Sequence, residues 1–148
     1  MKYSQASLGR VFVLRLEDGD IVHECLERFA REQSVSAAGL IALGDADAGS
    51  RLIAGTEAGR ADPLVFVERM LDEAHEIAGV GTIFPDDQGT PIPHVHMAFG
   101  RKDSVAVGCV RPGVKVWHVM EIIVVELRDS TAVRRFETGL PGFKLLNP

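Results

Sequence analysis

The sequence predicts one domain over residues 1–148, built mainly from β-strands with a single main helix packed against them. Hydrophobic and polar residues alternate with the period of a strand in most of the chain, and a helical period appears only over residues 20–33. Short clusters of Gly, Asp and Pro separate these segments, as turns do. A chain of 148 residues is long enough to bury most of its apolar surface without disulfides.

The first part of the chain places the helix between strands. Residues 10–16 alternate as a strand does, and Asp18-Gly19-Asp20 supplies a turn in which Asp20 is the expected N-cap of the helix. Apolar residues then recur at helical spacing to about residue 33, and Cys25 belongs to this stripe as a small core residue. Further extended segments are predicted over residues 36–43, 51–54, 64–68 and 70–84.

Two histidines mark the most informative strand. Residues 92–100 alternate as a strand and follow residues 74–84 after a loop, so these two strands are expected to form a hairpin. His94 and His96 then leave the same face of the sheet, with Cβ atoms about 6–7 Å apart. Two ring nitrogens at that spacing can reach one metal ion. The alternative is a pair of half-buried histidines whose nitrogens form hydrogen bonds with neighbouring groups.

Residues 104–110 return as a strand beside the histidines. The simplest turn gives these pairs: Phe99 with Ser104, His96 with Val107, and His94 with Cys109. Directly opposed residues point to the same face of a sheet, so this register brings the Cys109 thiol beside the two imidazoles. A bulge of one residue in the turn would place the thiol on the other face.

The last third of the chain contains the longest apolar strand, over residues 114–127. Both of its faces look buried, and since one helix covers one sheet face, the other face needs a partner subunit. His118 has apolar neighbours and is interpreted as a core or interface histidine. Residues 131–136 predict a final edge strand, and residues 140–148 form a tail that packs on the body or on a neighbouring subunit.

Composition weighs against two classes of partner. The net charge is −5, with 16 basic against 21 acidic residues and no basic run, whereas duplex DNA is bound first through its phosphates. No segment approaches the roughly 20 apolar residues of a membrane span. The first residues are followed by no signal-peptide core, so we expect a cytoplasmic protein in which Cys25 and Cys109 stay reduced.

With these segments in place, the chain resembles the PPC domain (plants and prokaryotes conserved) over nearly its whole length. The likeness includes residues 8–16, the Asp18-Gly19-Asp20 helix start, the segment ending at Gly44, and residues 94–100. The most specific feature of that family is a His-x-His strand followed by a Gly-Gly-His strand. Here His94-Val95-His96 matches the first motif, and Val107-Gly108-Cys109 stands at the second, so Cys109 takes the place of the third histidine.

The resemblance implies an α/β domain of the α+β type, with a mostly antiparallel sheet, one main helix and assembly as a homotrimer. It also implies a zinc-type ion on the histidines, as in several bacterial and archaeal members. In plants the domain is joined to AT-hook segments that bind DNA, and stand-alone members inherit a DNA-binding label. No such hook occurs in this sequence, so direct DNA binding has little support.

Two imidazoles and one thiolate form a ligand set that suits zinc or a similar divalent transition metal, with a fourth position open to water or a small ligand. We expect the ion on His94, His96 and Cys109. His75 and His118 are the alternatives to Cys109 as the third ligand.

An open position at the metal also fits a metal-dependent enzyme that acts on a small molecule. Such an enzyme needs a general base, for which Glu121, Glu76 and Asp103 are candidates that nothing in the sequence places at the site. We therefore favour a metal-binding, self-assembling protein, DNA-associated or regulatory by its family likeness, over an enzyme.

Overall fold

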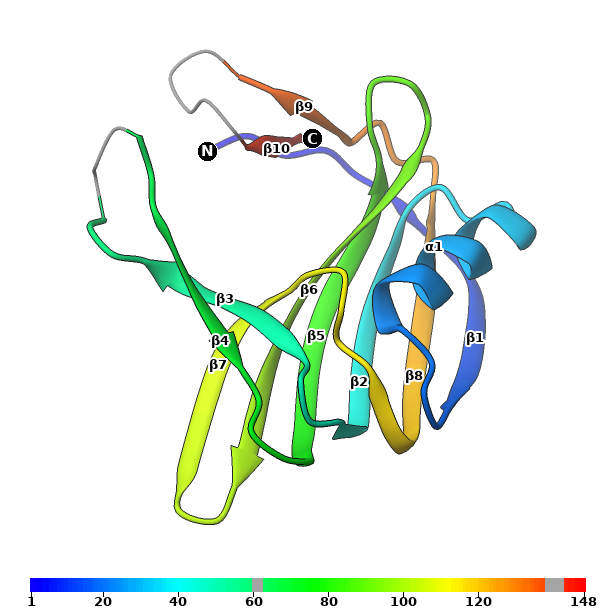
Figure 1. Cartoon of the computed structure of the whole chain (residues 1–148). Helices are drawn as coiled ribbons and strands as arrows, with labels where there is room; N and C mark the ends of the chain where they lie inside the picture. The colour runs from blue at the N-terminus through cyan, green and yellow to red at the C-terminus, as the bar shows by residue number, and fades with distance from the viewer. Residues whose placement is uncertain (60–62, 138–142) are drawn as a thin grey trace.

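The computed structural model describes residues 1–59, 63–137 and 143–148. These residues form an eight-stranded sheet, a separate two-stranded sheet and one α-helix (Figure 1). Along the larger sheet the strand order is β1-β8-β2-β5-β6-β7-β3-β4, with antiparallel pairing throughout. The expected α/β class of the α+β type, with a mostly antiparallel sheet and one main helix, is confirmed.

Most elements correspond in order to the predicted segments, but the segment predicted over residues 70–84 begins as a strand only at residue 75, and residues 144–147 form a strand where a tail was expected. The main sheet consists of β1 (Ser7–Glu17), β2 (Ala38–Ala46), β3 (Arg51–Thr56), β4 (Phe66–Met70), β5 (His75–Pro85), β6 (Pro91–Arg101), β7 (Ser104–Val110) and β8 (Val116–Arg128). The helix is α1 (Val22–Glu32), and the second sheet consists of β9 (Val133–Phe136) and β10 (Lys144–Asn147).

The end of the chain departs from the expectation of a final edge strand. β9 pairs with β10, which belongs to the predicted tail, and neither strand joins the main sheet. The first residues of that tail, 140–142, lie outside the described residues. A strand period shows that a segment is extended, but it does not show which partner the segment pairs with.

The start of α1 also differs from the prediction. The N-cap is Ile21, which has no capping side chain, and not Asp20. Asp20 instead closes the preceding turn, because its Oδ2 accepts a hydrogen bond of 2.9 Å from the Glu17 amide. The Val22 amide donates to the Val114 carbonyl, which holds this entry to the helix against the chain before β8.

One face of the main sheet packs under α1 and forms the core. Because opposed residues share a face, the register traces one row of side chains across six strands: Leu14, Ile122, Ala42, Gly79, Met97 and Gly108. The buried residues of α1 include Val22, Cys25 and Leu26. Phe29 meets Phe12 of β1 edge to face, with ring centroids 5.0 Å apart.

The next row lies on the opposite face, which we call the outer face of the sheet. It contains Val13, Ile123, Ile41, Val80, His96 and Cys109. The first four are exposed, so within a single chain β8 buries only the face that lies under α1. The two histidines therefore lie on the face that α1 does not cover.

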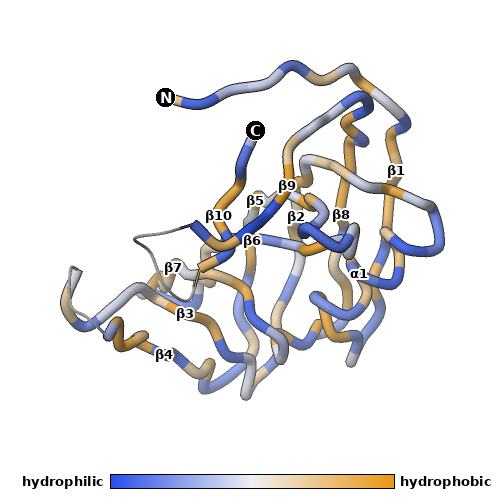
Figure 2. The backbone as a smooth tube through the Cα atoms, turned by 90° about the horizontal axis from the view of Figure 1, so that it is seen from above, coloured by the Kyte–Doolittle hydropathy of each residue, from blue (hydrophilic) through white to orange (hydrophobic). Residues whose placement is uncertain are grey.

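β9 and β10 approach the hairpin of β5 and β6 at its connecting loop. Asp86 in that loop forms a parallel bridge with Arg134 of β9, and its Oδ2 lies 2.9 Å from Nζ of Lys144 in β10. The two short strands lie apart from α1 when the molecule is seen from above (Figure 2). This position brings residues from the end of the chain next to the histidine strand.

Candidate metal centre

The pairing of β6 with β7 determines where the cysteine lies. His96 is directly opposite Cys109, and Arg101 is opposite Ser104. The expected pairing of His94 with Cys109 is therefore wrong by two residues, because the turn is Lys102-Asp103, with a positive φ of 53° at Lys102.

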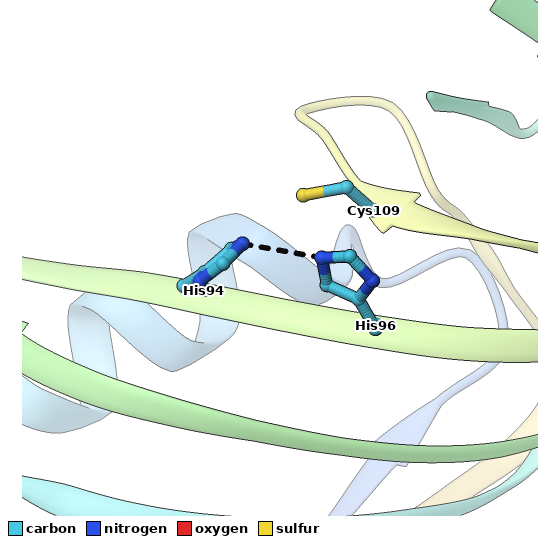
Figure 3. A group of neighbouring side chains, drawn as sticks. All are labelled: His94, His96 and Cys109. Carbon is cyan, nitrogen blue, oxygen red and sulfur yellow. Dashed lines mark hydrogen bonds between the residues drawn. The ribbon is translucent and has the colours of Figure 1, made fainter. Parts of the chain in front are cut away.

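An error of two residues preserves the face on which each side chain lies, since the period of a strand is two. The expected pairs of Phe99 with Ser104 and His96 with Val107 are wrong for the same reason; Phe99 is opposite Ala106. Cys109 nevertheless remains on the outer face with both histidines. The three side chains project from β6 and β7 on the same side of the sheet (Figure 3).

The three side chains bring their ligand atoms together. Among the described residues, His94, His96 and Cys109 form a group whose metal-binding atoms all lie within 4.8 Å of one another. Nε2 of His94 and Nε2 of His96 are 3.2 Å apart. Two nitrogens held at about 2.0–2.1 Å by a tetrahedral zinc ion are separated by about 3.3 Å. The observed spacing therefore fits zinc with little movement of the imidazoles.

Burial and neighbouring cations set the protonation of the ligands. Burial lowers the pKa of His94, and the positive charges of Arg134, His96 and Arg111 act in the same direction. Burial raises the pKa of the Cys109 thiol, while Arg111 and Arg134 act against this rise. The site thus favours a neutral His94 ring and a protonated thiol, and metal binding through sulfur would release that proton.

The candidate metal site lies in the wall of a pocket. The pocket has a volume of about 1080 Å³ and includes all three proposed ligands in its lining. Its apolar lining includes Ile53, Phe66, Phe136 and Phe143, and its charged lining includes Glu68, Arg111, Arg134 and Lys144. Cys109 is only 7% exposed, whereas both histidines are exposed toward this space.

The structure does not bring the two alternative histidines to the site. His75 is buried at the start of β5, where its Nδ1 lies 2.8 Å from the carbonyl oxygen of Glu73. His118 is exposed, and its amide donates to Oδ1 of Asp18. Of the two interpretations of His118, as a core or as an interface histidine, the first is wrong, because its φ of 59° interrupts the alternation of β8 and the side chain is exposed within one chain.

None of the three acids considered as a general base lines the pocket. Glu121 is opposite Arg15 near the β1 edge, Glu76 is opposite Gly100, and Asp103 lies in the turn between β6 and β7. The acid that does line it is Glu68 of β4. Sequence reasoning missed Glu68 because the period of β4 does not reveal that this strand extends the sheet beyond β3.

A glycine on β5 allows the close approach of β6 at the histidines. Gly81 is opposite Val95, and a Cβ atom added to it would lie 2.8 Å from the His94 carbonyl oxygen and 2.9 Å from Cγ2 of Val95. Both distances are too short for a real side chain. The absence of a side chain at Gly81 therefore helps to fix the backbone position of His94.

The chain belongs to a known family. The model of the Plants and Prokaryotes Conserved (PCC) domain, also written PPC, matches residues 3–128, which confirms the resemblance found in the sequence. Among curated proteins none matches the chain. In the part of the chain that the structure describes, α1 is too short to cross a membrane and no other helix is present.

Three solved structures illustrate the likeness. A metal-containing protein from Archaeoglobus fulgidus is 25% identical, with a TM-score of 0.84 over 98% of each chain. A PPC protein from Pyrococcus horikoshii is 19% identical, with a TM-score of 0.81 over 98% of this chain and 97% of that one. A protein from Ralstonia eutropha JMP134, provisionally described as DNA-binding, is 18% identical, with a TM-score of 0.75 over 92% of this chain and 90% of that one. The last two show the fold alone.

Proposed function

We propose that this chain is a small zinc-binding, self-assembling protein of the PCC family, with the ion on His94, His96 and Cys109. The observation that carries the proposal is the convergence of two imidazole nitrogens and one sulfur within 4.8 Å. Nitrogen and sulfur ligands favour zinc over magnesium or calcium, which prefer oxygen. Zinc bound there by three side chains keeps a fourth position for water or a small ligand.

Self-assembly as a homotrimer is the second part of the proposal. It rests on the family likeness and on the outer face, where Val13, Val80 and Ile41 are 81%, 63% and 56% exposed. These side chains lie in one row across neighbouring strands, and contiguous apolar surface of this kind marks interaction sites. We further propose that residues 1–148 act as one domain, since Asp86 in the loop between β5 and β6 forms a bridge with Arg134 of β9 and an ion pair with Lys144 of β10.

Direct binding to duplex DNA is not part of the proposed function. The net charge of −5 opposes contact with phosphates, and a DNA-associated or regulatory role would need another component to bind the nucleic acid. The expected cytoplasmic location suits the site, because the Cys109 thiol must stay reduced to bind an ion.

A metal-dependent enzyme acting on a small molecule is the second candidate. One observation favours it: a pocket of about 1080 Å³ opens onto the proposed metal ligands and includes Glu68 in its lining. Pockets of roughly 300–1,000 Å³ are typical of small-molecule sites. A carboxylate near a metal-bound water is the kind of group that accepts its proton.

Metal analysis after chelation and zinc reloading tests the proposal. The parent protein should hold about one zinc per chain, and His94→Ala and His96→Ala should lose it because two side-chain ligands cannot hold the ion tightly. Cys25→Ser is the matched control, since Cys25 lies in the helix core and should leave zinc content unchanged. An equal zinc content in His94→Ala and the parent would contradict the assigned ligands.

A further inference from the structure

Arg134 is a buried cation without a matching anion. Its residue is only 7% exposed, and its side chain lines the pocket beside the proposed metal ligands. Nη2 donates a hydrogen bond of 3.0 Å to Oγ1 of Thr82. Nε is fully buried and has no hydrogen-bond partner among the described residues, and no carboxylate of those residues lies within 4.0 Å of the guanidinium.

A buried guanidinium in this condition opposes folding. Removing a charge from water destabilises the folded state unless a partner offsets the loss of hydration, and an unsatisfied buried donor adds to this destabilisation. The neighbouring residue on the same strand shows the contrast, because Arg135 is exposed to solvent and has no such cost. A negatively charged group that enters the pocket and binds Arg134 would explain why an arginine stands at this buried position.

The rest of the pocket indicates the chemistry of that group. Lys144 is already paired with Asp86 at 2.9 Å, whereas Arg134 and Arg111 form no ion pair with the described residues. The aromatic side chains of Phe66, Phe136 and Phe143 supply apolar walls. This combination suits a small anion with an apolar body. The Nη hydrogens of Arg134 that do not bond to Thr82 have no partner among the described residues, and they suit a carboxylate, which accepts two parallel hydrogen bonds.

We propose that this pocket binds a small organic carboxylate, that Arg134 binds its carboxylate group, and that the aromatic walls hold its apolar body. Thr82, to which Arg134 bonds, is directly opposite His94 on the adjacent strand. Opposed residues have Cβ atoms about 4.5–5.5 Å apart, so the guanidinium lies one strand away from the proposed metal ligands. The inference rests on the proposed function in one respect only: the end of the ligand that is farthest from its carboxylate would meet the open position at the proposed zinc ion.

The first experiment compares three probes on the metal-free and the zinc-loaded protein by calorimetric titration. The probes are 3-phenylpropionate, the neutral 3-phenylpropionamide and inorganic phosphate. The acid should bind at least about tenfold more tightly than the amide in both protein forms, because a hydrogen-bonded charge pair is lost with the amide. Equal binding of acid and amide to the metal-free protein would overturn the proposal.

The two protein forms separate this proposal from the zinc proposal. A preference for the acid that appears only after zinc loading would mean that the ion binds the carboxylate, and Arg134 would lose its assigned role. A protein that takes up no zinc but still prefers the acid would support the role of Arg134 while the zinc assignment fails. Tighter binding of phosphate than of the acid would overturn the assignment of a carboxylate.

Variants provide the second experiment. Arg134→Met should remove the preference for the acid while leaving the melting temperature unchanged or higher, because an apolar side chain replaces a buried unpaired charge. A structural arginine would show the reverse, with a lower melting temperature and an unchanged preference. Arg135→Met is the matched control and should retain the preference. Arg134→Lys keeps the charge but not the paired donors, so the preference should fall without disappearing; an unchanged preference would contradict the proposal.

Discussion

His96 and Cys109 are directly opposed on β6 and β7, with His94 two residues away on the same face of β6. The third candidate ligand therefore comes from the neighbouring strand, at the position where the family resemblance places a histidine. The geometry depends on the register of one hairpin and not on a loop. A ligand set built on paired strands is held by the backbone hydrogen bonds of both.

Cys109→His should retain zinc, since imidazole replaces thiolate at the same register position. Cys109→Ala should weaken zinc binding by more than about 100-fold, because changes to outer-shell partners alone cost about 10–100-fold. Competition titration against a chromogenic zinc chelator measures both variants. Parental affinity in Cys109→Ala would show that the third ligand lies elsewhere.

Gly81→Ala should destabilise the protein by about 1–3 kcal/mol, the usual cost of overpacking. The added Cβ would meet the His94 carbonyl oxygen at 2.8 Å, so the backbone that carries the first ligand must move, and zinc affinity should fall with stability. Gly100→Ala is the control in the same hairpin, where the nearest atom to an added Cβ is 3.9 Å away. Urea denaturation of both variants measures the difference, and equal midpoints would contradict the account.

The parent protein should have about three times the chain mass of 16.0 kDa in solution. Ile41→Glu places a charge in the middle of the exposed apolar row and should convert the assembly to monomers, since a buried unpaired charge is costly. Met70→Glu changes a more exposed apolar residue, on β4, and should leave the mass unchanged. Light scattering coupled to size-exclusion chromatography measures all three, and a monomeric parent would exclude the homotrimer.

Random duplex DNA should bind no more tightly than about 10⁻⁵ M at physiological salt, within the ordinary non-specific range. The acidic net charge is the physical reason. Fluorescence anisotropy at several salt concentrations tests this expectation. Nanomolar binding with a steep salt dependence would show instead that the assembly gathers its basic residues on one surface.

The protein should lose stability in acid through Glu126. Its carboxylate accepts hydrogen bonds from Nε and Nη2 of Arg10 at 2.8 and 2.7 Å and from the Arg10 amide, which lowers the pKa of Glu126 from 4.5 to about 2. The folded state therefore binds the proton less readily than the unfolded state. The stabilisation is fully present above pH 4.5 and is lost as the pH falls from there toward about 2.

Glu126→Gln should lower stability at pH 7 and reduce its pH dependence below pH 4.5, measured by thermal melts across that range. Glu17→Gln is the control, because the Arg15–Glu17 pair is exposed on both sides and contributes little. An identical acid profile for Glu126→Gln and the parent would show that other carboxylates dominate the loss.

The sequence predicts the extended segments and the shared face of His94 and His96, because both follow from the strand period alone. The register of Cys109 depends on the position of the turn, which was expected one residue too early, and this displaces the strand pairing by two residues. The actual turn uses Lys102 at positive φ, which a residue other than glycine adopts at some cost and which no local pattern indicates. The three side chains nevertheless lie together on one face, because an even shift in register keeps the face.

The sequence alone could not indicate that Arg134 lies beside the histidine strand. Alternation within β9 separates Arg134 from Arg135, but it does not reveal that β9 crosses to Thr82 and Asp86 near the start of the histidine strand. That placement is a tertiary contact between segments about fifty residues apart, made by a backbone bridge to Asp86 and a side-chain hydrogen bond to Thr82. The pattern of apolar and polar residues within one segment cannot reveal such a contact.

The position of β8 between β1 and β2 has a consequence for synthesis of the chain. β1 pairs in the main sheet with β8 alone, and β8 begins at Val116. β1 therefore cannot form its pairing in the main sheet until β8, about a hundred residues later in the chain, has been synthesised. Strand pairings so distant in sequence fold slowly, and the edge of β2 that β8 will cover stays open to other extended chains until β8 has been synthesised.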